Sequence, residues 1–278
     1  MKYIDIHCHL DFPDYGDEIT GVLERMKEKG VGAITIGTDL ESSKRAVKIA
    51  EDSEKTGNKI WACIGVHPIQ NITPPRPTRP PLNLRGGERS EGVILELKKL
   101  VSYPKVVAIG ECGLDYYRIK DDSEKEVQKK LFIQQIEFAL KHNKPLMLHC
   151  RNSYDDVLEI LERYKKETGG KLRGNAHFFA GTIEQAKRFL DLGFTMSFTG
   201  VITFTHDYDE VIKFLPIESM MSETDAPFVA PVPYRGKRNE PSYVVEVVKK
   251  LAEIRGEEVE VLGQKLIENA KRVFGLLN

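Results

Sequence analysis

The chain has 278 residues, of which 41% are hydrophobic and 30% are charged, and its formal net charge is -1. This size suits one large α/β domain, and the near-zero net charge argues against a protein that coats duplex DNA. The sequence contains neither a long apolar run nor a basic segment followed by an apolar one, so we expect no membrane span, no signal peptide and a cytoplasmic location.

The first predicted element is a buried β-strand with the sequence Tyr-Ile-Asp-Ile-His-Cys-His over residues 3–9. Side chains alternate between the two faces of a strand, so Asp5, His7 and His9 are predicted on one face, with Asp5 one layer below His7 in a structural role. Two imidazoles on an apolar strand are costly to bury unless something binds their nitrogens, and a divalent metal is the usual partner. The alternative is a pair of hydrogen-bonded core histidines.

Apolar strand-like runs then alternate with helical periodicity, which is typical of parallel βαβ units. Further strands are expected at residues 32–36, 60–64, 106–109, 145–149, 173–177, 194–198 and 219–222. Helices are expected near residues 19–26, 46–50, 91–102, 132–140, 157–164, 183–190, 211–215 and 244–251, with a helical tail to residue 274. These repeats predict a single-domain (β/α)8 TIM barrel. The alternative, an open doubly wound sheet, would normally carry a Gly-rich phosphate turn after the first strand, which this sequence lacks.

One segment, at about residues 69–90, interrupts this alternation. It holds five prolines and four arginines, namely Pro74, Pro75, Pro77, Pro80, Pro81, Arg76, Arg79, Arg85 and Arg89. So many prolines cannot propagate a helix, so we expect a long exposed loop or mobile flap after the third strand.

The four cysteines show no CxxC spacing, and each lies in or beside an apolar, strand-like stretch. They are Cys8, Cys63, Cys112 and Cys150. We therefore expect small reduced core residues rather than a zinc knuckle or a disulfide framework.

Polar residues that can bind metals occur at the ends of several predicted strands: His7, His9, His67, Glu111, His149, His177 and Asp225. In a (β/α)8 barrel the loops after the strands build the active site. With His67 set aside, the other six residues offer too many nitrogen and oxygen ligands for one zinc with an open position, but they suit two divalent ions bridged by a carboxylate. We assign His7 and His9 to one ion, and His149 and His177 to the other. Glu111 is expected between them.

Asp225 is expected to complete the first metal site and to act as the general base that takes a proton from the attacking water. The two remaining histidines are expected elsewhere. His142 closes a helix on the opposite rim, and His206 lies at a predicted helix start.

The chain resembles the TatD family of metal-dependent deoxyribonucleases. The resemblance rests on His7-x-His9, Gly-Glu111-Cys-Gly-Leu-Asp115, His149-Cys-Arg, His177-Phe-Phe and Glu-Thr-Asp225-Ala-Pro, and it extends to Asp11-Phe12, Gly65-Val66-His67-Pro68 and Arg235-Gly-Lys-Arg-Asn-Glu-Pro241. His-x-His alone would indicate only the wider amidohydrolase-like barrel superfamily. The resemblance implies a two-metal phosphodiesterase that acts on DNA, with 3'-to-5' exonuclease character. It matches His7, His9, Glu111 and Asp225 to the first metal site, and Glu111, His149 and His177 to the second.

Other residues near these motifs are candidates for holding the substrate. His67 is expected to contact the scissile phosphate, although a metal ligand and a turn cap are alternatives. Asp115 is expected to bind substrate or to orient a metal ligand. Arg151 and Arg235 are candidate phosphate contacts, the alternative for the second being a structural role of its loop. The segment at residues 69–90 departs from the family pattern, because it is longer and richer in proline and arginine, and it is either a solvated insertion or an electropositive lid over the nucleic-acid backbone.

Two other functions remain open. The metal centre can instead serve an amidohydrolase or esterase that acts on a small molecule, or the barrel can be a non-enzymatic scaffold. The basic residues near the mouth favour DNA as the substrate, and no motif indicates a protein partner. Four histidines favour Zn²⁺ or Mn²⁺, whereas carboxylates and a phosphate substrate are also compatible with Mg²⁺.

Overall fold

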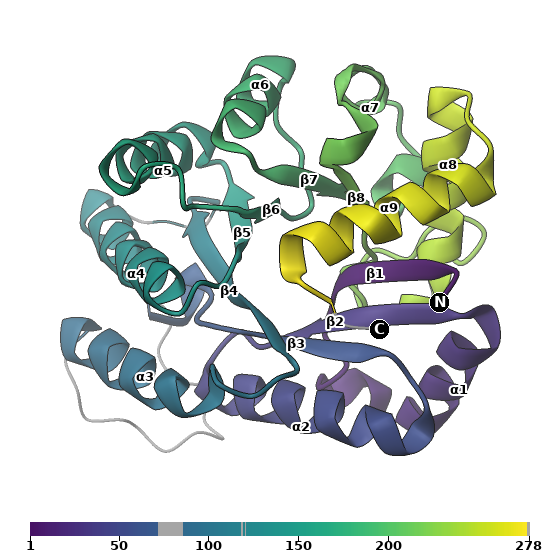
Figure 1. Ribbon diagram of the computed structural model, residues 1–278, viewed down its shortest axis with the longest axis horizontal. Coiled ribbons are helices and arrows are strands. Elements are labelled where there is room, and N and C mark those ends of the chain that lie inside the picture. Colours follow the sequence, from purple (N-terminus) through teal and green to yellow (C-terminus); the bar gives the residue numbers. More distant parts are fainter. Residues whose placement is uncertain (72–85, 118, 120, 277–278) are drawn as a thin grey trace.

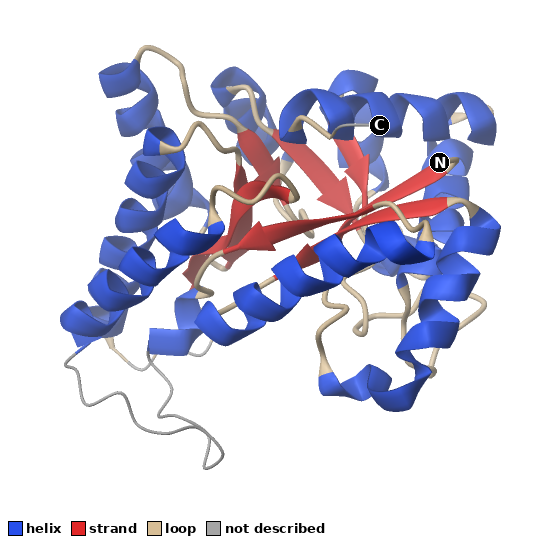
Figure 2. Cartoon of the chain, turned by 60° about the horizontal axis from the view of Figure 1, so that its bottom comes forward, coloured by secondary structure: helices blue, strands red, loops and turns tan. Residues whose placement is uncertain are grey.

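Eight parallel strands form one sheet in sequential order, and helices alternate with them along the chain (Figure 1). The computed structural model describes residues 1–71, 86–117, 119 and 121–276. The strands are β1 (Tyr3–Cys8), β2 (Val31–Ile36), β3 (Ile60–Ile64), β4 (Val106–Asp115), β5 (Leu146–Arg151), β6 (Gly174–Ala176), β7 (Thr195–Phe198) and β8 (Met220–Ser222). The helices surround the strands (Figure 2), so the predicted (β/α)8 barrel is confirmed.

The α-helices are α1 (Ile19–Lys29), α2 (Leu40–Thr56), α3 (Gly86–Leu100), α4 (Asp122–Lys141), α5 (Tyr154–Thr168), α6 (Ile183–Leu192), α7 (Asp209–Phe214), α8 (Val244–Arg255) and α9 (Val259–Phe274). Short 3-10 helices are η1 (Pro13–Glu18), η2 (Pro68–Asn71), η3 (Gly200–Thr203), η4 (Ile217–Ser219) and η5 (Pro241–Tyr243). Within the described ranges, no helix combines the length and the apolar character that crossing a bilayer requires.

The barrel closes between β1 and the segment that follows β8. The Asp225 amide donates a hydrogen bond to the His7 carbonyl at 2.9 Å, and the His9 amide donates to the Ala226 carbonyl at 2.8 Å. Cys8 and Ala226 form a parallel bridge at the same point. Closure therefore brings the ends of the first and last strands together.

Apolar residues fill the amino-terminal end of the barrel. One cluster joins side chains of β1 to β5 and β8 with α9 and Leu276: Ile4, Ile6, Ile34, Ile36, Trp61, Cys63, Val107, Ala108, Met147, Met221, Ile267, Ala270, Val273, Phe274 and Leu276. These strands form the wall of the barrel, so the cluster that their side chains share fills its interior. Helix α9 crosses the amino-terminal end of the barrel (Figure 1). A second cluster packs the outer strand faces against the helices. The carboxyl ends of the strands are left for polar side chains.

The helix ends follow local sequence signals. Asp39 caps α2 and accepts a hydrogen bond from the Ser42 amide, and Thr182 caps α6 in the same way through Gln185. The cap at Asp39 starts α2 at Leu40, six residues before the helix expected from apolar periodicity alone. Capping satisfies amide groups that the first turn leaves unpaired, which explains the earlier start.

The segment expected to be irregular at residues 69–90 is shorter than predicted. A 3-10 turn covers its first residues, and α3 begins at Gly86. The last proline of the segment is Pro81, so nothing after it forbids a helix. Residues 72–85, with Pro74, Pro75, Pro77, Pro80, Pro81, Arg76, Arg79 and Arg85, lie outside the described residues. The four cysteines are free and buried, as expected.

We expect Thr182→Ala to lower the free energy of unfolding by about 1 kcal/mol, because the Gln185 amide loses its capping partner. Urea denaturation followed by circular dichroism measures the change. Glu184→Ala, on the same turn but exposed, is the matched control and should change stability little. Equal stability of Thr182→Ala and the native chain would contradict the role of the cap.

Candidate metal centre

The structure brings all six predicted metal ligands together at the carboxyl end of the barrel. Glu111 lies at the centre of the group and is 4% exposed. Its Oε2 lies 3.5 Å from His7 Nε2 and 3.9 Å from His9 Nε2. Asp225 faces the same two imidazoles, with its Oδ1 3.8 Å from His7 Nε2 and 3.5 Å from His9 Nε2. One oxygen of Glu111 and one of Asp225 therefore converge on the His-x-His pair.

The other oxygen of Glu111 faces a second set of imidazoles. Its Oε1 lies 2.6 Å from His149 Nδ1, 3.0 Å from His177 Nε2 and 3.4 Å from His67 Nε2. The two carboxylate oxygens thus divide five histidines into two groups, which is the arrangement expected of a residue shared between two cations.

Two irregularities in the strands aim these side chains into the barrel. The β1 pairing with β2 shifts register between Asp5 and Cys8, and the β4 pairing with β5 shifts between Ile109 and Cys112. A bulge adds a residue to one strand and redirects a side chain. Because Ile6 already faces the interior, simple alternation would turn His7 away from it.

The same shift corrects the sequence analysis at Asp5. Asp5 was predicted inside the barrel below His7, but the interior positions of β1 belong to Ile4 and Ile6. Asp5 instead lies beside the segment after β8, where its carboxylate accepts hydrogen bonds from the amide and hydroxyl of Thr224. It also accepts from the His7 amide at 3.1 Å, so it supports the backbone of the strand end.

The buried carboxylates and imidazoles of the centre shift one another's pKa values in directions that favour bound cations. Burial alone would raise the pKa of Glu111, but the charges of His177 and His67 and hydrogen bonds from His149 and His177 lower it well below its ordinary value. Burial likewise opposes a proton on His177, yet Glu111 and Glu223 raise the pKa of that imidazole. Ionised carboxylates in a buried site attract positive charge, whether protons on imidazoles or a bound metal.

The donor atoms fit a divalent metal. The His7 ring is fully buried, and neither of its nitrogens has a hydrogen-bond partner among the residues that the structure describes. Leaving a buried imidazole without partners is costly, so a ligand that accepts its lone pair explains the arrangement. Donor atoms lie within 4.8 Å of one another in three groups: His7, His9 and Glu111; His67, Glu111 and His149; and His7, His177 and Glu223.

Hydrogen bonds from outside the cluster orient two of the imidazoles. His9 Nδ1 lies 3.1 Å from the Ile36 carbonyl, which requires a proton on Nδ1 and leaves Nε2 free to face Glu111. Asp115 Oδ2 lies 3.1 Å from His149 Nε2, and Asp115 Oδ1 accepts a hydrogen bond from the Tyr117 amide. Of its two predicted roles, the position of Asp115 fits the orientation of His149.

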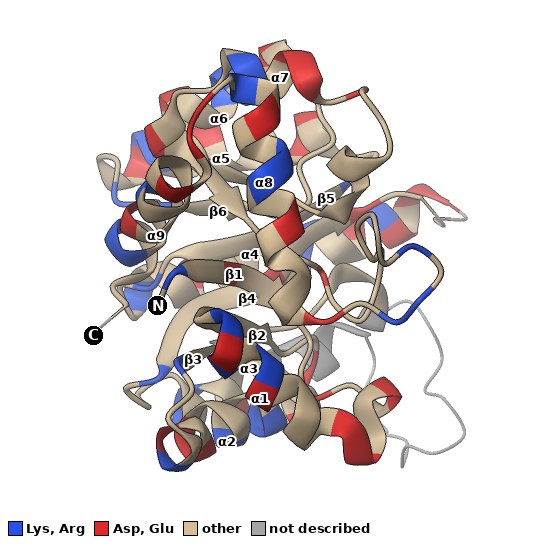
Figure 3. Cartoon of the chain, turned by 90° about the vertical axis from the view of Figure 1, so that its right-hand side faces the viewer, with Lys and Arg blue, Asp and Glu red and all other residues tan. Residues whose placement is uncertain are grey.

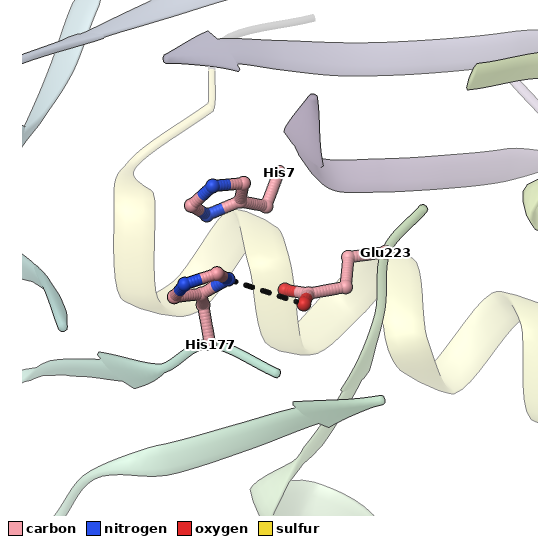
Figure 4. Close-up of side chains that lie close together, drawn as sticks. All are labelled: His7, His177 and Glu223. Atoms are coloured by element: carbon pink, nitrogen blue, oxygen red, sulfur yellow. Dashed lines mark ion pairs between the residues drawn. The ribbon is translucent and has the colours of Figure 1, made fainter. Parts of the chain in front are cut away.

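Sequence reasoning missed Glu223, which is completely buried. Its Oε1 lies 3.3 Å from His177 Nδ1 and accepts a hydrogen bond from the Phe178 amide, while its Oε2 accepts from the Ser197 hydroxyl at 2.6 Å. In Figure 4 its carboxylate points at His177, whose ring lies parallel to the His7 ring, with the ring centroids 3.8 Å apart. The signal that could have found it is an acidic residue directly after a buried strand, two positions before Asp225.

The two predicted arginine contacts with substrate follow or end strands at the same end of the barrel. Arg151 ends β5 two residues after His149, and its guanidinium carbon lies 3.8 Å from the centre of the Tyr117 ring. Arg235 follows β8, and its guanidinium carbon lies 3.9 Å from the centre of the Phe204 ring. Both guanidinium groups therefore lie against exposed aromatic side chains.

The two remaining histidines lie outside the centre, as predicted. His142 is the carboxyl-terminal cap of α4, and its ring packs on Phe138. His206 lies before α7, and its Nδ1 is 2.9 Å from Asp209 Oδ2.

A model of the family described as TatD related DNase matches residues 4–275. The chain is 36% identical to the uncharacterized metal-dependent hydrolase YabD of Bacillus subtilis (strain 168), covering 97% of this chain and 98% of that protein. It is 32% identical to the uncharacterized metal-dependent hydrolase YcfH of Escherichia coli (strain K12), covering 99% and 96%. The crystal structure of YjjV, a TatD homolog from Escherichia coli K12, aligns with a TM-score of 0.84 and 28% identity over 99% of both chains.

We expect Glu223→Gln to weaken metal binding by about 10–100-fold, because His177 loses the carboxylate that orients its ring. Competition with a chromogenic chelator measures the affinity directly, without reference to activity. Glu218→Gln, a surface change just before β8, is the control and should bind metal normally. Native metal affinity in a folded Glu223→Gln protein would rule out the positioning role.

Proposed function

We propose that this chain, which belongs to the TatD family of metal-dependent hydrolases, cleaves phosphodiester bonds of DNA in single strands or at frayed ends. The observation that carries the proposal is the pair Arg151 and Arg235. Within the described residues neither guanidinium contacts a carboxylate, whereas Arg25, for example, is paired with Glu240 at 2.6 Å. A guanidinium held flat and left without an acid is suited to bind a phosphate.

Charge elsewhere supports this choice of substrate. Basic and acidic residues are interspersed along α1 and α8 (Figure 3). Arg151 lies two residues after His149 at the end of β5, and Arg235 lies on the segment after β8 with its guanidinium against Phe204. A neutral amide or lactone would gain little from two such groups, whereas a DNA strand carries a phosphate on each side of the scissile bond.

We infer that two divalent ions bind here, one held by His7, His9 and Asp225, the other by His149 and His177, with Glu111 shared. When bound, such ions lower the pKa of water and stabilise charge on the phosphoryl and leaving oxygens.

Asp225 is the base in this proposal. Burial alone would raise its pKa, but the hydrogen bond with His9 and the charges of His7 and His177 lower it, so the carboxylate is ionised and can accept a proton.

Asp225 is also the more accessible of the two central carboxylates. Its side chain is 14% exposed, compared with 5% for Glu111. A base that receives a proton from water and passes it to solvent needs that access. Glu111 is enclosed by imidazoles and is suited to hold cations rather than to exchange protons.

The proposal is tested by giving the metal-loaded protein end-labelled single-stranded DNA with Mg²⁺ or Mn²⁺, beside a panel of cyclic amides and lactones. We expect turnover of the DNA and two equivalents of metal by elemental analysis. Glu111→Ala should abolish turnover, because one carboxylate faces both groups of histidines. Asp225→Asn should lower kcat more than metal content. Turnover confined to the small-molecule panel would refute the DNA assignment.

We further expect Arg151→Ala and Arg235→Ala each to lower kcat/KM on single-stranded DNA by about tenfold or more, through loss of a charge-assisted hydrogen bond to phosphate. The dependence on salt concentration should also become shallower. Arg163→Ala, which removes an arginine stacked on Tyr164 away from the centre, is the matched control. Native kinetics at every salt concentration in both variants would exclude the phosphate contacts.

A further inference from the structure

An aromatic pair lies beside the metal centre and has no part in the chemistry proposed above. The Phe12 and Phe228 rings meet edge to face, with their centroids 5.5 Å apart. Both contact the His9 ring, at centroid distances of 5.0 Å and 6.2 Å. Phe228 is 45% exposed although it lies only three residues after Asp225. A large apolar ring is thus open to solvent at the edge of the catalytic centre.

The backbone that carries Phe228 is held firmly. Its amide donates to the Asp225 carbonyl at 2.9 Å, and its carbonyl accepts from the side chain of Asn239, which is completely buried. Gly200 lies against the following residues so closely that an added Cβ would lie 2.7 Å from the Val229 carbonyl oxygen. The ring therefore stays exposed on an anchored turn.

We propose that Phe228, supported by Phe12, stacks on the unpaired base of the nucleotide beside the scissile phosphate. This inference rests on the proposed function. A phosphate held next to His9 brings its own nucleoside to the neighbouring ring, and every base offers a flat face to an aromatic side chain. A paired base in a duplex is covered by its neighbours. The pair therefore selects single strands and frayed ends without reading sequence.

The experiment compares two short, fluorescently labelled strands of equal length. One is oligothymidylate, and the other carries tetrahydrofuran abasic residues on the same phosphodiester backbone. Binding is measured by anisotropy in the presence of a chelator, and kcat/KM is measured separately with metal. Phe228→Ala should weaken oligothymidylate binding by about tenfold and leave the abasic strand unchanged. Phe228→Trp should retain native binding.

Phe214→Ala is the matched control, because Phe214 is a 38% exposed phenylalanine on α7. It should bind both strands as the native chain does, and thermal unfolding checks that each variant is folded. Equal loss on both strands, or no loss on oligothymidylate, overturns base stacking. Base-dependent binding without any DNA cleavage would keep the stacking inference and reject the proposed function. If the native chain cleaves DNA but Phe228→Ala binds both strands as the native chain does, the proposed function stands and the stacking inference is rejected.

Discussion

Glu111 carries a carboxylate into the interior of the barrel, where an unbalanced charge is costly. It is tolerated because imidazoles from four parts of the chain, at β1, β3, β5 and β6, converge on its two oxygens. Those imidazoles in turn crowd one another, as the close stacking of His7 on His177 shows. Carboxylates and unprotonated ring nitrogens gathered in this way balance best around divalent cations. The centre therefore depends on a charge balance that no single strand can supply.

The two ends of the barrel divide folding from chemistry. Apolar side chains and α9 fill the amino-terminal end, where the burial of apolar surface stabilises the strands. The carboxyl end can then carry buried histidines and acids. Barrel closure joins the two tasks, since the hydrogen bond between Asp225 and His7 both completes the ring of strands and fixes two residues of the centre.

The eight-fold repeat and the histidines at the strand ends could be predicted because periodicity and strand polarity are properties of local sequence. What could not be predicted depends on contacts between strands. The end of β4 was placed at Ile109, yet the strand continues to Asp115 because its second half pairs with β5. The orientation of His7 depends on a register shift, which alternation along one strand does not encode. Glu223 was missed because its partners come from other strands: Ser197 lies on β7, and His177 follows β6.

In the proposed function, different parts of the mouth carry recognition and chemistry. The ligands of the centre lie on strand ends that hydrogen bonds to buried carbonyls and acids hold in place, as Ile36 does for His9. Arg151 and Phe228 instead lie where the strands give way to loops, one resting on an aromatic ring and the other on an anchored turn. These outer side chains are largely exposed and contribute little to the core, so they can change without unfolding the barrel. In this proposal the groups that select the substrate and the groups that react with it are separate sets of residues, so a substitution at Arg151 or Phe228 changes the choice of substrate without disturbing the donor atoms around Glu111.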